Sequence, residues 1–343
     1  MTKTQTGAPL LEMCHVKKEF VLDQSFLDTV KLRGGKITRE KRAVHAVNNL
    51  SLSVQKGDAL CVVGESGCGK STVARLIAGL LKPTEGSIHF EGNRIDNRSR
   101  KQLLPVRKKM QMIFQNPYAS LNPRMSIQQS LEEPVRYHMP SLSQYEIKDK
   151  VAEVMQSVGV DPSWATRYPH EFSGGQRQRI AIARALTVDP EFIIADEPIS
   201  ALDVSIQAQV LNLMLEAKED RGLTYLFITH DLSVVEHFGT QVAVLYLGSV
   251  CELADTATLF ENPKHPYTKA LLSAVPQLSD DSPSHIRLKG EIPTPINLPN
   301  GCPFESRCAF ANDRCKIEKP VPSKQPDGSL VACHAVEEDR LEN

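Results

Sequence analysis

The chain has 343 residues, of which 41% are hydrophobic and 24% charged, and its formal net charge is −1 at pH 7. This length suits one large domain with a smaller one, and the near-neutral charge argues against a nucleic-acid-binding surface. No apolar stretch reaches the roughly 18 residues of a membrane span, and the polar start lacks a signal-peptide core, so we expect a cytosolic protein with reduced cysteines.

The N-terminal part is predicted to form a small antiparallel sheet. Residues 10–20 have a strand-like composition, and residues 44–54 alternate apolar and polar side chains as a half-buried strand does. Residues 86–92 and 110–115 are predicted as further short strands. The basic segment 31–42 is predicted to be a solvated loop.

A phosphate-binding loop follows the apolar run 59–63. It reads Gly64-Glu65-Ser66-Gly67-Cys68-Gly69-Lys70-Ser71, the pattern G-x-x-x-x-G-K-S, and it precedes a predicted helix over 71–81. Its glycines let backbone N–H groups turn inward at a helix N-terminus, where the helix dipole favours anions. We expect Lys70 to reach the β- and γ-phosphates of a nucleotide and Ser71 to bind Mg²⁺. The flanking strand and helix argue against a functionless glycine-rich turn.

Residues 119–171 predict amphipathic helices punctuated by prolines, which indicates a helical subdomain of about 119–175 inserted into an α/β chain. The segment Ser173-Gly174-Gly175-Gln176 closes this insertion ahead of a further helix. Ser173 is a typical N-cap residue, and the two glycines permit close approach of the backbone to a ligand. The segment therefore predicts a second helix N-terminus that faces a phosphate.

An apolar strand over 192–197 is predicted to end in Asp196 and Glu197. Asp196 suits Mg²⁺ ligation, and Glu197 suits a general base that polarises the attacking water. Neighbouring residues of a strand point to opposite faces, so we expect the two carboxylates to do different jobs. His230 follows another apolar strand, over 224–229. We expect a functional histidine there, because ligands of open α/β sheets bind at this edge.

These motifs, taken together, resemble the nucleotide-binding subunit of ABC transporters over roughly residues 10–275. The matching features are the loop at Gly64, Gln115, residues 173–176, Asp196, Glu197, Ser200-Ala201-Leu202-Asp203 and His230. Phe172 stands where this family's signature usually begins with Leu. The resemblance implies an α/β P-loop ATPase core with an antiparallel β subdomain and an inserted helical subdomain. It also implies ATP hydrolysis with ATP held between two subunits.

The resemblance assigns nucleotide and metal roles to individual residues. Phe20 is expected to stack on adenine, with a core aromatic as the alternative. Gln115 is expected to contact Mg²⁺ and the attacking water, and His230 to grip the γ-phosphate. The residues expected to hold the triphosphate and Mg²⁺ are Gly64, Ser66, Gly67, Cys68, Gly69, Lys70, Ser71 and Thr72.

Other roles that the resemblance implies lie across a subunit interface. Ser173, Gly174, Gly175 and Gln176 are expected to meet ATP bound to the loop of a second, similar ATPase subunit. Asp203 is expected at the same interface.

The C-terminal extension, 276–343, follows the ATPase domain, 1–275, and contains Cys302, Cys308, Cys315 and Cys333. Their spacing is not that of a zinc ribbon, but four thiolates could hold a [4Fe-4S] cluster or zinc, or stay free. The run Asn262-Pro263-Lys264-His265-Pro266-Tyr267 and these cysteines resemble the dipeptide/oligopeptide importer ATPases. That resemblance favours a structural [4Fe-4S] cluster. The other four, Cys14, Cys61, Cys68 and Cys251, are predicted to be small core residues.

The same resemblance implies partners and a location. It predicts a heterodimer with a second ATPase subunit under two membrane permeases, which are fed by an extracytoplasmic binding protein. The chain would then lie at the cytoplasmic face of the plasma membrane as a peripheral subunit, with no nucleic-acid partner. Peptides are the expected cargo. The alternatives are nickel or other small solutes, a soluble ATPase that does not act in transport, and a redox sensor in the tail.

Overall fold

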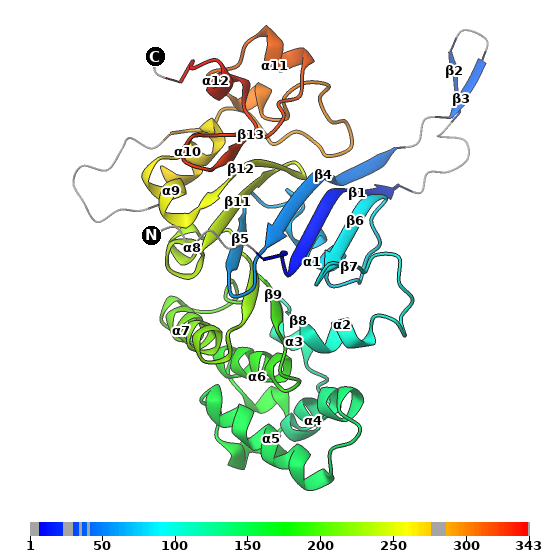
Figure 1. The fold of residues 1–343 in the computed structure, drawn as a ribbon, viewed down its shortest axis with the longest axis vertical. Coiled ribbons are helices and arrows are strands. Elements are labelled where there is room, and N and C mark those ends of the chain that lie inside the picture. Colours follow the sequence, from blue (N-terminus) through cyan, green and yellow to red (C-terminus); the bar gives the residue numbers. More distant parts are fainter. Residues whose placement is uncertain (1–6, 23–29, 34–35, 40–41, 276–285, 342–343) are drawn as a thin grey trace.

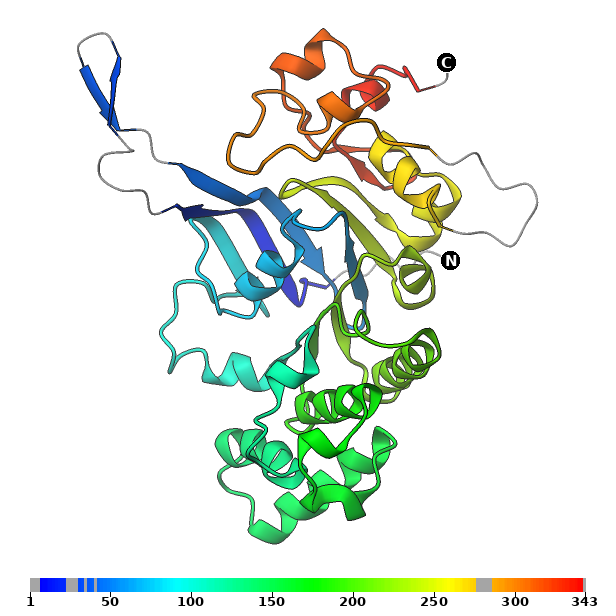
Figure 2. The same ribbon diagram turned by 180° about the vertical axis from the view of Figure 1, so that it is seen from behind.

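The structure is a computed structural model that describes residues 7–22, 30–33, 36–39, 42–275 and 286–341. Two sheets occupy the middle of the molecule, a helical subdomain lies at one end, and the C-terminal extension lies at the other (Figures 1 and 2). None of the helices in these ranges is both long and apolar enough to cross a membrane.

The larger sheet has eight strands in the order β13-β14-β12-β11-β5-β10-β9-β8. β5, β9 and β10 are buried throughout and β8, β9, β10, β5 and β11 run parallel, as expected of a sheet covered on both faces. The strand bounds are β5 Ala59–Val63, β8 Met110–Ile113, β9 Phe192–Asp196, β10 Thr224–Ile228, β11 Gln241–Tyr246, β12 Ser249–Asp255, β13 Ser323–Lys324 and β14 Leu330–Val331. The strand predicted over 110–115 therefore ends two residues early, which leaves Gln115 in the following turn.

The smaller sheet is antiparallel, with the order β4-β1-β6-β7. It contains β1 Leu11–Val21, β4 Ala43–Val54, β6 Glu85–Phe90 and β7 Asn93–Arg94. The predictions of strands over 10–20, 44–54 and 86–92 are confirmed. Leu50, Leu52 and Val54 of β4 alternate with more exposed neighbours, so one face of this sheet covers the core.

The basic segment predicted to be a loop contains two paired strands instead. β2 Val30–Arg33 and β3 Lys36–Arg39 form an antiparallel two-stranded sheet of their own, so the loop prediction was wrong for these residues. Figure 1 shows this pair projecting away from the two main sheets. The β-branched residues at 30, 37 and 38 favour a strand. The loop prediction rested on the many charged residues and did not weigh this preference.

The helical subdomain follows the core sheet after β8. Ser126 and Ser143 precede the helices Ile127–His138 and Gln144–Ser157 and form capping boxes, in which a serine and a residue three positions later satisfy each other's backbone N–H groups. Phe172 is buried beside Trp164, with ring centroids 5.9 Å apart, so it serves the subdomain core. The elements are α3 Pro117–Ser120, α4 Ile127–His138, α5 Gln144–Ser157, η1 Pro162–Thr166, η2 Pro169–Glu171 and α6 Gly174–Leu186.

The remaining helices pack around the core sheet and in the extension. Their bounds are α1 Lys70–Ile77, α2 Leu104–Lys109, α7 Val204–Arg221, α8 Leu232–Phe238, α9 Thr256–Glu261, α10 Pro266–Leu272, η3 Glu305–Arg307, α11 Asp313–Ile317 and α12 His334–Glu337. The helix predicted over 71–81 ends early, because Gly79 adopts a positive φ of 65° just after Ala78.

The C-terminal extension is joined to the core sheet. Its strand β14 pairs with β12, with Val331 opposite Glu252 and Leu330 opposite Leu253. The N–H of His45 also donates to the carbonyl of Pro295 at 2.8 Å, which ties the start of the extension to β4. The division into units 1–275 and 276–343 stays a prediction.

Candidate functional site

The phosphate-binding loop lies between β5 and α1, as the sequence predicts. Two glycines are required there by close backbone approach. A Cβ on Gly64, whose φ is 149°, would lie 2.2 Å from the carbonyl oxygen of Leu245. A Cβ on Gly69, whose φ is 105°, would lie 2.2 Å from the carbonyl oxygen of Ala46. Only glycine fits these two positions, so neighbouring strands fix the course of the loop.

Lys70 and Ser71 begin α1 and point back toward the loop. The Nζ of Lys70 donates to the carbonyls of Gly64 at 2.6 Å and Glu65 at 3.1 Å. The Ser71 hydroxyl donates to Oδ1 of Asp196 at 3.0 Å. The structure thus brings together two side-chain oxygens, one from α1 and one from the end of β9, of the kind that Mg²⁺ prefers. Burial raises the pKa of Asp196, although the bond from Ser71 opposes this rise.

Two predicted catalytic side chains converge on the carboxylate of a third, Glu197. Gln115 donates through Nε2 to Oε2 of Glu197 at 2.9 Å, and Nδ1 of His230 lies 3.5 Å from the same oxygen. Each of the three follows a different parallel strand: β8, β9 and β10. The sheet therefore places all three predicted residues at one edge.

The expectation that Asp196 and Glu197 alternate along one strand was wrong. β9 ends at Asp196, and Glu197 has a φ of 48°, in the left-handed region. The N–H of Glu197 donates to the carbonyl of Ile228 at 2.9 Å, so the neighbouring β10 holds this turn. The two carboxylates still point in different directions, but a backbone turn that costs free energy sets the direction of Glu197.

Residues 173–176 form the start of α6. Ser173 accepts the N–H of Gln176 at 3.4 Å, and the side chain of Gln176 accepts the N–H of Ser173 at 2.9 Å. Gly175 has no room for a side chain, since a Cβ would lie 2.4 Å from Ile206. Gly174 lines a cleft of about 620 Å³ that also holds Gln115, Glu197 and His230 in its walls.

The remaining predicted site residues differ in exposure. Phe20 lies near the end of β1 with the Nζ of Lys18 5.0 Å from its ring centre. Ser66 is exposed and Thr72 is half-buried, whereas Cys68 is buried. Asp203 precedes α7 without capping it through its side chain. The nucleotide roles of these residues stay predictions.

The four cysteines of the extension are near one another. Burial raises the pKa of Cys302 to about 12 and of Cys308 to about 11, and the charges of the other thiols in the group add to both rises. The N–H of Cys302 donates to the carbonyl of Cys315 at 2.7 Å, and Cys333 is buried beside them.

Their sulfur atoms are nevertheless spread more widely than four thiolates around one zinc ion, which lie roughly 3.8 Å apart for tetrahedral bonds of 2.3 Å. Among the described residues, the group whose ligand atoms all lie within 4.8 Å of one another is Glu12, Cys14 and His89, on β1 and β6. Cys14 is half-exposed, so its prediction as a core residue was wrong: it points to the face of β1 away from the core.

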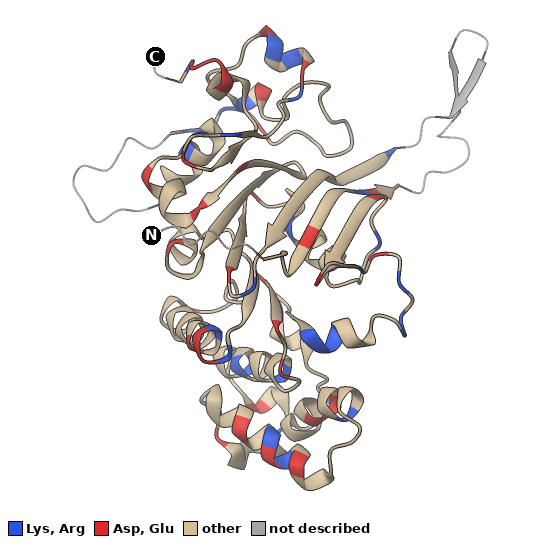
Figure 3. Ribbon diagram, in the orientation of Figure 1, with Lys and Arg blue, Asp and Glu red and all other residues tan. Residues whose placement is uncertain are grey.

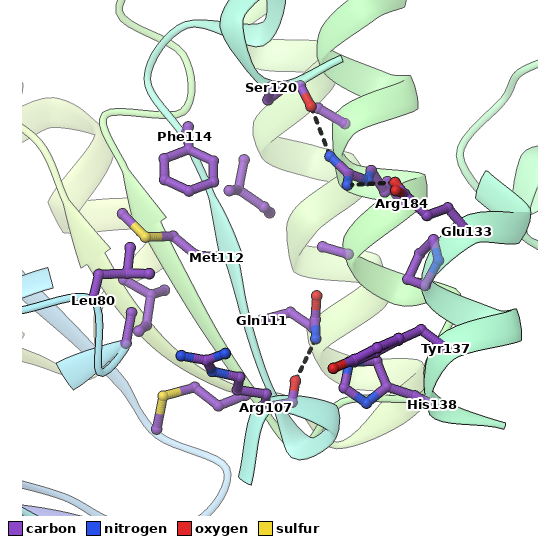
Figure 4. Close-up of a pocket in the computed structure, with 17 residues that line it drawn as sticks. Leu80, Arg107, Gln111, Met112, Phe114, Ser120, Glu133, Tyr137, His138 and Arg184 are labelled. Atoms are coloured by element: carbon purple, nitrogen blue, oxygen red, sulfur yellow. Dashed lines mark hydrogen bonds and ion pairs between the residues drawn. The ribbon is translucent and has the colours of Figure 1, made fainter. Parts of the chain in front are cut away.

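A groove of about 430 Å³ separates the core sheet from the helical subdomain (Figure 4). Arg184 of α6 crosses its upper end, donating to the carbonyl of Ser120 at 2.7 Å and to Glu133 at 3.1 Å. Exposed apolar side chains stand on both walls. The residues labelled in the figure are Leu80, Arg107, Gln111, Met112, Phe114, Ser120, Glu133, Tyr137, His138 and Arg184.

Two residues near the loop escaped sequence reasoning. Arg307 of the extension forms an ion pair with Glu65, and the hydroxyl of Tyr267 accepts the N–H of Glu65 at 2.9 Å. Tyr267 belongs to the run that marks the importer resemblance, but nothing in its spacing indicates a contact with a loop 202 residues away.

Family models match two parts of the chain. A family model described as ABC transporter matches residues 47–200, and one described as Oligopeptide/dipeptide transporter, C-terminal region, matches residues 251–315. The chain is 50% identical to the oligopeptide transport ATP-binding protein AppF of Bacillus subtilis, over 95% of this chain and 97% of that one. It is also 50% identical to the dipeptide transport ATP-binding protein DppF of Haemophilus influenzae, over 98% and 99%.

Solved structures extend the agreement to the fold. The dimeric post-hydrolysis state of the ATP-binding cassette MJ0796, bound to ADP and phosphate, superposes with a TM-score of 0.62 at 27% identity. That match covers 72% of this chain and 98% of the solved chain. The expected P-loop ATPase fold is confirmed.

Proposed function

Because the chain belongs to the ABC transporter family, as an ATPase of its oligopeptide/dipeptide branch, we propose that it hydrolyses ATP to power import of short peptides. The observation that carries this proposal is the convergence of Gln115 and His230 on Glu197 beside the loop. The names of the relatives supply the cargo class.

In the proposed reaction, Glu197 accepts a proton from the attacking water. The amide of Gln115 and the ring of His230 hold its carboxylate in position, so the base does not have to be ordered during the reaction. Lys70 leaves its carbonyl partners and contacts the β- and γ-phosphates. Ser71 and Asp196 fit Mg²⁺ as oxygen ligands, and the ion would neutralise charge on the phosphates.

We propose that a second ATPase subunit completes the site. The loop supplies donors from one side only, and a helix N-terminus with two glycines can supply backbone N–H groups from the other. Ser173 to Gln176 would serve the partner's ATP in this way. Val204, 82% exposed at the start of α7 next to Asp203, is an apolar side chain suited to burial between the subunits.

The groove of Figure 4 is proposed to receive a cytoplasmic segment of a membrane permease. Leu80, Phe114 and Tyr137 are exposed apolar side chains on its walls. The last turn of α2, beside the groove at Arg107, carries three basic residues and is coloured blue in Figure 3. A permease segment with apolar and acidic side chains would match this surface, and the subunit would then be peripheral to the membrane.

We also propose that the four cysteines hold a [4Fe-4S] cluster. Four thiols, of which three are buried and that of Cys308 is half-buried, suit such a cluster. The cluster is larger than a single ion, in keeping with the spread of the sulfur atoms. The neighbouring strand β14 pairs with the core sheet, so the cluster would stabilise the extension.

The function can be tested in a strain that needs imported peptides for growth. The chain is expressed there together with its candidate permeases and partner ATPase. Peptide uptake and co-purification from membranes are expected, and Lys70→Ala should abolish uptake and nucleotide binding together. Recovery with ribosomes or DNA and without any permease would overturn the transport proposal. Uptake of nickel but not peptide would overturn the cargo alone.

A further inference from the structure

We propose that Arg307 is a positioning residue for the phosphate-binding loop, so that the C-terminal extension forms part of the nucleotide site. This inference rests on the proposed nucleotide site and goes beyond it. No motif connects the two segments: 242 residues separate Arg307 from its partner, Glu65. The link exists because the extension folds back over the carboxyl edge of the core sheet.

The contact between Arg307 and Glu65 is a two-pronged ion pair. Nη1 of Arg307 donates to Oε2 of Glu65 at 2.6 Å, and Nη2 donates to Oε1 at 3.0 Å. The side chain of Arg307 is only 7% exposed, and its guanidinium also lies near the hydroxyl of Tyr246. A bidentate pair shielded from water restricts both partners far more than a solvated surface pair does.

Glu65 is fixed at its backbone as well. Its N–H donates to the hydroxyl of Tyr267, whose ring is fully buried. That ring lies 5.4 Å from Phe304 of the extension and 4.9 Å from Tyr246, measured between centroids. The extension therefore holds Glu65 by a charged contact and supports the aromatic residue that holds its N–H.

The tether reaches the residue that grips phosphate. The carbonyl of Glu65 accepts a hydrogen bond from Nζ of Lys70, and it also accepts the N–H of Cys68 at 3.3 Å. A displacement of Glu65 would move both the turn of the loop and a resting contact of Lys70. Loss of Arg307 would also leave an uncompensated, partly buried carboxylate beside a site for a triphosphate. Both effects weaken ATP binding, whereas the Gln115, Glu197 and His230 group is untouched.

The position of Arg307 gives this contact a further consequence. Arg307 is the last residue of η3, and the next residue, Cys308, is one of the four clustered thiols. Loss of whatever the cysteines hold would loosen the arginine that steadies the loop. The affinity for ATP would then depend on whether the extension is correctly folded.

The test compares Arg307→Met, Glu65→Gln and the double variant in the assembled transporter. Arg314→Met is the matched control, because Arg314 pairs with Glu318 and Glu338 on the surface of the same extension. We expect Arg307→Met to raise the Kd for a fluorescent ATP analogue and the KM for ATP about tenfold. The kcat at saturating ATP should change less than about twofold, and the control should match wild type.

Coupling separates positioning from general stabilisation. The Kd of the double variant for ATP should be no higher than that of the single variant with the higher Kd, because each substitution breaks the same contact. Arg307→Lys should recover part of the affinity, since it keeps the charge but not the fork. An unchanged Kd in Glu65→Gln and Arg307→Met, with only a lower Tm, would overturn the inference.

Three further outcomes have defined consequences. If Arg307→Met does not fold, Glu65→Gln, which preserves size and shape, must still weaken ATP binding or the inference fails. If wild type does not bind nucleotide, or Lys70→Ala binds it normally, the proposed function fails and this inference with it. If Lys70→Ala fails to bind ATP, as expected, but neither Arg307→Met nor Glu65→Gln weakens ATP binding, this inference alone is overturned.

Discussion

Mild acid is expected to destabilise the fold around His265. Its Nδ1 accepts the N–H of Tyr267 at 3.0 Å at the start of α10, and burial lowers its pKa to about 3. Histidine in an unfolded chain has a pKa of about 6.5. Below about pH 6.5 the imidazole of His265 therefore binds a proton in the unfolded chain but stays neutral in the folded chain. The contribution to stability is complete above this pH and is lost as the pH falls toward 3.

The magnitude follows from these two pKa values. At pH 5.5, proton uptake by the unfolded chain lowers the free energy of unfolding by about 1.4 kcal/mol relative to pH 7.5. A carboxylate also contacts this segment: Glu252 of β12 accepts the N–H groups of Lys264 and His265 at 2.9 Å each. Burial raises the pKa of Glu252, so its own effect in acid has the opposite sign.

His265→Asn isolates the histidine from such other groups. Asparagine is a favoured N-cap residue and can still accept the N–H of Tyr267, but it does not titrate. Urea unfolding of both proteins at pH 7.5 and 5.5 should show a loss of stability about 1.4 kcal/mol larger in wild type. Equal losses in both proteins would refute this reasoning. So would a nuclear magnetic resonance signal of the His265 ring that titrates near pH 6.5.

Three further predictions concern the nucleotide site and the cysteines. Glu197→Gln should keep ATP binding and reduce turnover by roughly 10²- to 10⁴-fold, as loss of a general base does; unaltered turnover in an ATPase assay contradicts the assignment. Gly69→Ala should abolish ATP binding in a filter assay, because its Cβ would lie 2.2 Å from the carbonyl of Ala46, and wild-type affinity would show that the loop can move. Cys302→Ser should remove visible absorbance from anaerobically purified protein, whereas colourless wild type with stoichiometric zinc would overturn the cluster proposal.

The sequence was most informative where a motif ends a buried strand. Gln115, Glu197 and His230 could be grouped in advance because parallel strands bring their carboxyl ends to one edge. The left-handed turn at Glu197 could not be predicted, because it depends on a hydrogen bond from its N–H to β10. The contact of Arg307 with Glu65 was missed for a related reason. Glu65 lies in a loop and Arg307 ends the single turn η3, so neither has periodic neighbours, and only the tertiary fold brings them together.

The order of the phosphate-binding loop affects how the free energy of ATP binding can be used. Gly64 and Gly69 lie against backbone carbonyls of other strands, and Arg307 and Tyr267 hold Glu65. A loop fixed in this way loses little conformational entropy when a ligand binds. In the proposed dimer, more of the binding free energy is then available to draw the partner's α6 onto the γ-phosphate. Hydrolysis removes that phosphate and therefore the contacts that hold the two subunits closed. In this way a loop held rigid by the extension can drive movement between subunits.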